Sequence, residues 1–180
     1  FSTSDEMTVT VTDLIFADSF EAGDLAAWSG SVSDGGDLSV VSGQGPKRLQ
    51  ALLDDNNTIY VRDDSPVAEP RYRVRFYFHP NNIEMAPNEM HQIFSGRTAA
   101  GAVVLQIEFR YTESQAYQVR ALILGNGITF TSSGWFTISN APHALELDWR
   151  AASAPGANNG GVTFWIDGVP KADVTGIRND

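Results

Sequence analysis

Apolar and polar residues alternate with a period of two along most of this chain. Within residues 71–79, Tyr72, Val74, Phe76 and Phe78 alternate with arginine, tyrosine and histidine. Successive side chains of a β-strand point to opposite faces, so this alternation puts one face toward a core and the other toward water. We find no window with the i, i+3, i+4, i+7 spacing of an amphipathic helix. The pattern therefore predicts an all-β protein.

The same alternation predicts short strands along the whole chain, bounded by clusters of glycine, aspartate, asparagine, serine and proline. Evenly spaced short strands of this kind favour an antiparallel sandwich over a parallel α/β sheet. The expected strands are residues 7–12, 15–18, 38–41, 48–53, 58–62, 71–79, 91–97, 103–111, 117–124, 143–150 and 162–167.

The polar faces of the strongest strands carry arginine, glutamine, glutamate, aspartate and tyrosine. Guanidinium and carboxylate groups pair with sugar hydroxyls and uronates, and aromatic rings stack on pyranose faces. If these strands share a sheet, its outer face is a candidate glycan-binding surface. The alternative is an ordinary solvated sheet whose charge pairs contribute about 0.2–1 kcal/mol each. The candidate ligand-binding residues are Arg73, Arg75, Tyr77, Gln106, Glu108, Arg120, Glu146 and Trp165.

Two tryptophans are candidates for stacking on a sugar ring. Trp135 and Trp165 are the candidate sugar platforms, because Trp149 counts into the core by the same alternation.

Composition narrows the range of functions. The 180 residues suffice for one sizeable core, and no apolar run approaches the roughly 20 residues of a membrane span. Twelve basic and twenty-two acidic residues give a net charge of −10, which disfavours nucleic acid and anionic lipid as partners. The chain has no cysteine, so disulfides, thiolate metal sites and cysteine nucleophiles are excluded.

Two parts of the chain resemble a known family. Residues 15–28 follow the pattern D-x-F-E-x-G-x-L-x-x-W, and residues 143–150 with residues 162–169 form a strand pair that ends in Trp-Ile-Asp-Gly. Both are similar to concanavalin A-like lectin/glucanase (laminin G-like jelly-roll) modules of large exported bacterial proteins. The resemblance runs from Leu14 to the end. It implies a two-sheet antiparallel jelly-roll sandwich in an extracellular or cell-surface protein.

The chain departs from this family at both ends. Family modules usually continue beyond residues 177–180 with one or two more strands, and residues 4–12 look instead like the last strand of a PKD-type or immunoglobulin-like domain. We expect residues 1–13 to be a separate strand or linker, and residues 14–180 to be a sandwich that lacks its last strand or strands. A fragment of a longer protein and a polymer that pairs edge strands between copies both remain open.

The resemblance also implies calcium near the acidic stretch 18–24. Asp18, Glu21 and carbonyls around Gly23 would supply part of a shell of about six to eight oxygens, with Asp173 as the candidate distant ligand. The alternative is a solvated acidic turn.

Catalysis has weaker support. Retaining glycoside hydrolases need two carboxyl groups about 5–5.5 Å apart. Laminarinase-type members of the family carry Glu-x-Asp-x-Glu on one strand, whereas here Glu146 and Asp148 are followed by Trp149 and Arg150. The third acid is therefore absent, which counts against hydrolysis.

The arginine, tyrosine and histidine residues bear on two further kinds of chemistry. Alginate-lyase-type members use arginine, glutamine, histidine and tyrosine, and Arg75, Tyr77, His91 and Gln92 offer these types without the family's motif order. The three histidines lie on separate strands, which predicts turn-capping or surface roles, and no Gly-x-Ser-x-Gly elbow indicates a Ser-His-Asp triad.

The sequence thus predicts an extracellular, non-catalytic carbohydrate-binding or adhesion module, with polysaccharide or glycan as partner. The alternatives are a structural subunit of a surface or filament assembly held by strand pairing, and a polysaccharide lyase or glycoside hydrolase. Fold alone does not choose among them.

Overall fold

The computed structural model describes residues 14–43 and 45–180 of the chain. These residues form β-strands and one short 3-10 turn, η1 (Asp34–Gly36), and no α-helix is found among them. Every strand pair is antiparallel, which confirms the predicted all-β architecture. The part of the chain described here contains no helix long and apolar enough to span a bilayer.

The chain divides into two compact units, residues 1–67 and residues 68–180. The predicted strand 7–12 lies outside the described residues. The assignment of residues 1–13 to a separate strand or linker and of residues 14–180 to one sandwich therefore stays a prediction.

The first unit holds two small antiparallel pairs. Strand β1 (Gly30–Val32) pairs with β4 (Tyr60–Arg62), and β2 (Leu38–Gly43) pairs with β3 (Gly45–Ala51). Strand β1 was not predicted, because it lies in a segment rich in serine, glycine and aspartate that reads as a loop.

The predicted strand 15–18 is wrong, because these residues form no strand. Asp18 instead accepts a hydrogen bond from the amide of Phe20 at 2.8 Å. The ring of Trp28 packs on Phe16, with ring centroids 4.6 Å apart, and stacks on Phe20 at 6.1 Å. This local aromatic cluster explains the apolar residues that the alternation assigned to a strand.

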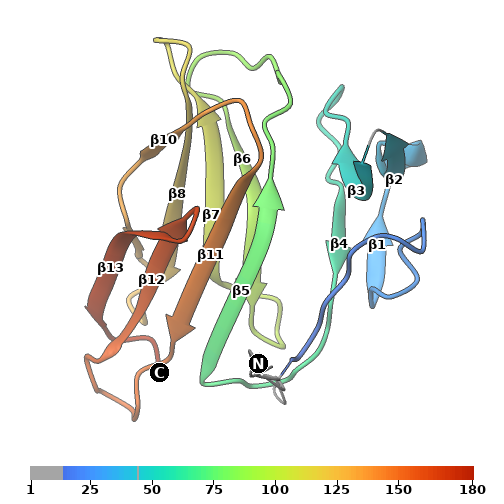
Figure 1. The fold of residues 1–180 in the computed structure, drawn as a ribbon. Coiled ribbons are helices and arrows are strands. Elements are labelled where there is room, and N and C mark those ends of the chain that lie inside the picture. The colour runs from blue at the N-terminus through green and yellow to red at the C-terminus, as the bar shows by residue number, and fades with distance from the viewer. Residues whose placement is uncertain (1–13, 44) are drawn as a thin grey trace, which may run out of the picture. The chain divides into compact units, whose positions relative to one another are not determined.

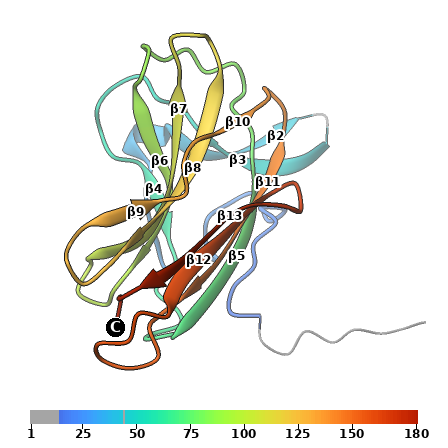
Figure 2. The ribbon, with the colours of Figure 1, turned by 90° about the vertical axis from the view of Figure 1, so that its left-hand side faces the viewer.

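The second unit is built from two sheets. One has the strand order β13–β12–β11–β5, and the other has the order β10–β8–β7–β6, with β9 also paired to β8. Figures 1 and 2 show the two sheets as separate layers. Their strands are β5 (Arg71–Phe78), β6 (Met90–Arg97), β7 (Val103–Tyr111), β8 (Tyr117–Leu124), β9 (Phe130–Ser132), β10 (Phe136–Ile138), β11 (His143–Arg150), β12 (Gly160–Ile166) and β13 (Val169–Ile177).

The core of this unit lies between the two sheets, and both contribute to it. The alternating residues predicted to face inward do so: Ile107 on β7 and Leu147 on β11 are fully buried, and Phe76 on β5 packs against them as part of one cluster. Burying a large aliphatic or aromatic side chain contributes about 1.5–3 kcal/mol. The fully buried large side chains are Leu105, Ile107, Phe109, Val119, Ile123, Leu145, Leu147, Val162 and Phe164.

Three strands of this unit were not predicted from the sequence. Strands β9 and β10 have only three residues each, too few to show a period. Strand β13 contains Pro170 and Gly176 and has little apolar alternation. Proline is tolerated there because β13 is an edge strand, paired among the described residues only with β12.

Candidate functional site

The structure divides the eight predicted ligand-binding residues between the two sheets. Arg73, Arg75 and Tyr77 lie on β5, with Glu146 on β11 and Trp165 on β12, so these five share one sheet. Gln106, Glu108 and Arg120 lie on β7 and β8 of the other sheet. The condition that these strands share one sheet is therefore not met, and the unit has two candidate surfaces.

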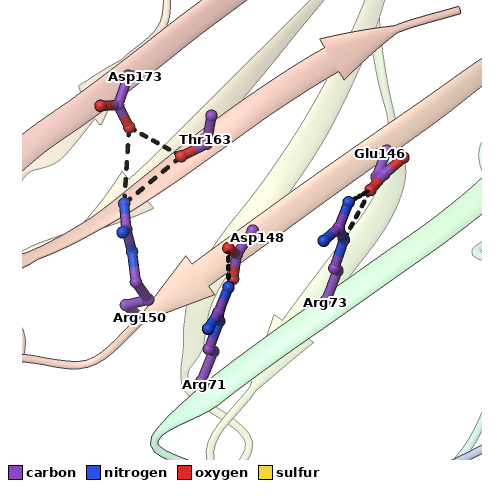
Figure 3. A network of polar contacts seen from close by, with 7 residues as sticks. All are labelled: Arg71, Arg73, Glu146, Asp148, Arg150, Thr163 and Asp173. Atoms are coloured by element: carbon purple, nitrogen blue, oxygen red, sulfur yellow. Dashed lines mark hydrogen bonds and ion pairs between the residues drawn. The ribbon is translucent and has the colours of Figure 1, made fainter. Parts of the chain in front are cut away.

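We call the outer surface of the β13–β12–β11–β5 sheet the arginine face, and Figure 3 shows most of it. Arg71 binds Asp148 through two parallel hydrogen bonds, Nε to Oδ1 at 2.8 Å and Nη2 to Oδ2 at 2.6 Å. Arg73 donates to Oε1 of Glu146 from both Nε, at 2.7 Å, and Nη2. The residues of the arginine face are Arg71, Arg73, Arg75, Tyr77, Glu146, Asp148, Arg150, Thr163, Trp165 and Asp173.

A third pair continues this row onto β13. Nη2 of Arg150 lies 3.6 Å from Oδ1 of Asp173, and Thr163 donates a hydrogen bond to the same oxygen at 2.8 Å. Asp173, the predicted distant calcium ligand, is therefore part of the arginine face and already binds a cation and a hydroxyl. Its carboxylate is the β13 end of the network.

The ion pairs on this face are diagonal. In the β5–β11 register Arg73 lies opposite Asp148 and Glu146 lies opposite Arg75, yet Arg73 binds Glu146. Diagonal neighbours on one sheet face are about 7–8 Å apart, which a long arginine side chain spans. Because Glu146 forms its ion pair with Arg73, the directly opposed Arg75 remains available for other contacts.

Two aromatic rings lie beside these arginines. The guanidinium carbon of Arg75 is 5.5 Å from the ring centroid of Tyr77, and its Nη2 donates to the Tyr77 hydroxyl at 3.2 Å. The guanidinium of Arg73 lies 5.4 Å from the ring of Trp165. Tyr77 is 71% exposed, while Trp165 is half-buried. The face thus combines aromatic rings with planar charged groups.

The two carboxylates of β11 are both paired with arginines of β5. Asp148 is only 5% exposed, and its hydrogen bond with Arg71 lowers the pKa of this carboxyl below its ordinary value. A glycosidase general acid requires a raised pKa, so the shift at Asp148 runs in the opposite direction. Glu146 accepts both of its hydrogen bonds from Arg73 at one oxygen, Oε1. Both acids of the predicted Glu-x-Asp pair therefore lie on one face as ion-pair partners.

The four residue types considered for lyase chemistry do not share a surface. Arg75 and Tyr77 are neighbours on β5, whereas His91 and Gln92 lie on β6 in the other sheet. Gln92 donates to Gln106 at 2.7 Å and belongs to that second surface.

We call the outer surface of the other sheet the tryptophan face. Gln106 and Arg120 both donate to the carboxylate of Glu108, at 2.7 Å each. Trp135 lies against two guanidinium groups, at 4.0 Å from Arg110 and 4.4 Å from Arg120. The residues of the tryptophan face, from β6 to β10, are Gln92, Gln106, Glu108, Arg110, Gln118, Arg120, Trp135 and Thr137.

The proposed calcium ligands of the first unit are engaged by protein donors. Asp18 accepts hydrogen bonds from the Phe20 amide and, at 2.8 Å, from the Trp28 indole. Glu21 accepts from the Lys47 amide at 3.0 Å, and the Lys47 ammonium lies 2.9 Å from the Glu21 carbonyl.

A calcium ion at this place would have to displace these donors and a lysine, so the residues do not fit calcium as they stand. The described residues contain no group of three or more histidine, aspartate or glutamate side chains close enough to bind one metal ion. The calcium prediction therefore rests on the family resemblance alone and stays a prediction.

Sequence reasoning missed one polar cluster, at the end of the sandwich. Nδ1 of His143 lies 2.7 Å from Oδ2 of Asp167, and its Nε2 lies 2.9 Å from the Ser139 hydroxyl. The Ser139 amide also donates to Nε2 at 3.1 Å, and Asp167 accepts from the Ala144 amide at 2.9 Å. These contacts tie the β10–β11 turn to the β12–β13 turn.

This arrangement agrees with a turn-capping histidine. Serine, histidine and aspartate are in contact here in the order of a catalytic triad. The Ser139 backbone N–H donates to the Nε2 lone pair, so a structural role of the histidine explains this order. From the sequence, only the positions of His143 at the start of β11 and Asp167 directly after β12 could have suggested this contact.

No family model, curated protein or solved structure matched the chain.

Proposed function

We propose that residues 68–180 form a non-catalytic carbohydrate-binding or adhesion module that binds polysaccharide on the arginine face. In this proposal the sandwich is a concanavalin A-like jelly roll and the protein is extracellular or displayed at a bacterial cell surface. The observation that carries the proposal is the pairing of exposed Tyr77 with Arg75, next to Trp165, Arg73 and Glu146, on one sheet.

The chemistry of this face suits sugar recognition. Sugars offer hydroxyl groups that bind in pairs to guanidinium and carboxylate groups, and apolar ring faces that stack on aromatic side chains. The ion pairs of Arg71 and Arg73 hold these groups in place before a ligand arrives. Binding then costs less side-chain entropy than on a mobile surface.

The two alternatives have less support on this face. Hydrolysis would require one raised carboxyl pKa, whereas that of Asp148 is lowered by Arg71. Assembly by strand pairing would use an exposed edge, and β13 is such an edge, but Pro170 and Lys171 on it are residue types that discourage pairing.

The proposal is tested by glycan-array binding followed by calorimetry on the best ligand. We expect Tyr77→Ala and Trp165→Ala each to weaken binding about tenfold, equivalent to about 1.4 kcal/mol. Tyr60→Ala is the matched control, because Tyr60 is an exposed tyrosine of the first unit and is not a residue of this sheet. All variants should keep the wild-type unfolding temperature within a few degrees.

Two results would contradict the proposal. New reducing or unsaturated ends in a polysaccharide panel would indicate an enzyme. Concentration-dependent polymers that disappear when residues 1–13 are deleted, without any glycan binding, would indicate an assembly subunit.

A further inference from the structure

Trp135 is placed by an interruption in an edge strand. Strand β9 pairs with residues 122–124 of β8, and β10 pairs with residues 117–119 of the same strand, both antiparallel. Because they run in one direction along one edge of β8, β9 and β10 form a single strand that is broken at residues 133–135. Such irregularities re-aim side chains and are frequent beside binding sites.

The break is held to β8 by two hydrogen bonds between Ser133 and Ala121. The Ser133 amide donates to the Ala121 carbonyl at 2.9 Å, and the Ala121 amide donates to the Ser133 hydroxyl at 3.0 Å. Gly134 follows with φ of +83°, a conformation that side chains other than glycine rarely adopt. The indole of Trp135 is thereby brought against the outer surface of β7 and β8, and not toward the core.

The guanidinium groups of Arg110 and Arg120 lie against this indole, and each is hydrogen-bonded to one partner residue. Arg110 uses Nε and Nη2 to bind Oε1 of Gln118, at 2.9 and 2.7 Å. Arg120 uses the same two nitrogens to bind Glu108. Among the described residues, Nη1 of Arg110 and Nη1 of Arg120 have no hydrogen-bond acceptor.

The local charge is positive although the chain is acidic. Two arginines and one carboxylate, that of Glu108, gather around Trp135. Most of the net charge of −10 comes from residues 1–67, which contain twelve acidic and three basic residues. Residues 68–180 contain ten acidic and nine basic residues, so the second unit is nearly neutral. An anionic ligand is therefore repelled little by the unit that carries this cluster.

We propose that Trp135, Arg110 and Arg120 bind a carboxylate-bearing sugar of an acidic polysaccharide. The Nη1 groups of the two arginines bind the uronate carboxylate, and the indole stacks against the sugar ring. This inference rests on the proposed carbohydrate-binding function, but it names the ligand class and places it on the tryptophan face. Because the arginine face belongs to the other sheet, the two sites are independent and can be tested separately.

The test compares polygalacturonate oligosaccharides with their methyl-esterified forms, which have the same rings without the charge. We expect the wild-type protein to bind the acidic form at least tenfold more tightly, and this preference to fall as salt screens the interaction. Arg110→Met and Arg120→Met should each remove most of the preference. Trp135→Ala should weaken binding, and Trp135→Phe should retain part of it.

A matched control separates a specific site from general charge. Arg97→Met removes an arginine of the same sheet that binds Ser95 and the Gly101 carbonyl and does not contact Trp135. This variant should bind the acidic oligosaccharide like the wild type. Circular dichroism and unfolding temperature check that each variant is folded.

The outcomes distinguish this inference from the proposed function. If acidic binding is lost in Tyr77→Ala and Trp165→Ala but not in the Arg110 and Arg120 variants, the inference is wrong while the proposed function stands. Equal binding of acidic and esterified forms, or an equal loss in Arg97→Met, would also overturn the inference. If no glycan binds at all, both proposals fail.

Discussion

Arg71 and Asp148 form a two-pronged ion pair although they are not opposed in the sheet register. Arg71 lies opposite Arg150, and its guanidinium reaches two residues along β11 to bind both oxygens of Asp148. This diagonal contact separates two arginines that would otherwise face each other. It also satisfies a carboxylate that is almost fully buried.

We predict that Asp148→Asn destabilises the protein at neutral pH by about 1–3 kcal/mol, because an amide cannot accept both Arg71 donors as an anion does. The Arg71 hydrogen bond lowers the pKa of Asp148, so its stabilisation is present above the ordinary carboxyl pKa and is lost as the pH falls through the lowered one. The difference between wild type and variant should therefore shrink as the pH falls below the ordinary carboxyl pKa. Urea unfolding at several pH values measures it, and a difference that grows toward acid would contradict it.

The diagonal arrangement predicts which pair is coupled. A double-mutant cycle with Arg73→Met and Glu146→Gln should give a coupling of about 0.2–1 kcal/mol, since these side chains are in contact. The cycle with Arg75→Met and Glu146→Gln should give almost none, although Arg75 is the directly opposed residue. The opposite order of couplings would show that the direct register decides the pairing.

The contact between His143 and Asp167 predicts a tautomer. Because the Ser139 amide donates to Nε2, the imidazole proton must be on Nδ1, where Asp167 accepts it. Nitrogen chemical shifts of the neutral His143 ring should report the Nδ1–H form. Finding the Nε2–H form would refute the proposed hydrogen-bond directions.

The same contact predicts a pH-dependent effect of Asp167→Asn. The hydrogen bond with His143 lowers the pKa of Asp167, so its stabilisation exists above the ordinary carboxyl pKa and disappears as the pH falls through the lowered value. Asparagine keeps the oxygen for the Ala144 amide but faces His143 with a donor. Because the Asp167 side chain is about half exposed, solvent screens this contact, and we expect a loss below about 1 kcal/mol at neutral pH and convergence with the wild type in acid, measured by urea unfolding.

Gly161 is predicted to be required where β12 passes β13. A Cβ atom at Gly161 would lie 2.3 Å from the Val174 carbonyl oxygen, so Gly161→Ala must push backbone apart at a bulge. We expect a loss of about 1–3 kcal/mol. Gly127→Ala is the control, because a Cβ there meets nothing within 4 Å, and its unfolding midpoint should barely change.

Asp18→Asn should weaken the aromatic cluster of the first unit. Asp18 accepts from both the Phe20 amide and the Trp28 indole, and asparagine has one acceptor oxygen for the two donors. We expect a loss of about 1 kcal/mol and a change in tryptophan fluorescence. The same variant tests the calcium prediction, since a calcium-dependent rise in wild-type unfolding temperature that Asp18→Asn abolishes would support calcium at this place.

Local alternation was enough to determine the class of the protein and the orientation of its best strands. Phe76, Ile107 and Leu147 point into the core, and Arg75, Glu108 and Glu146 point outward, because side-chain direction in a strand follows position along the chain. Periodicity failed at residues 15–18, where apolar residues pack around Trp28 and form no strand, and at β9, β10 and β13, which are too short or too irregular to show a period.

Tertiary structure decided everything that depends on which strands are neighbours. The sequence could not show that β5 and β7 belong to different sheets, so it grouped Arg73 with Glu108 on one surface. It could not choose Glu146 as the partner of Arg73, nor show that a break beside Ala121 carries Trp135 over two arginines. Sheet membership and register are set by packing between segments far apart in the chain, and this information is not present in any single strand.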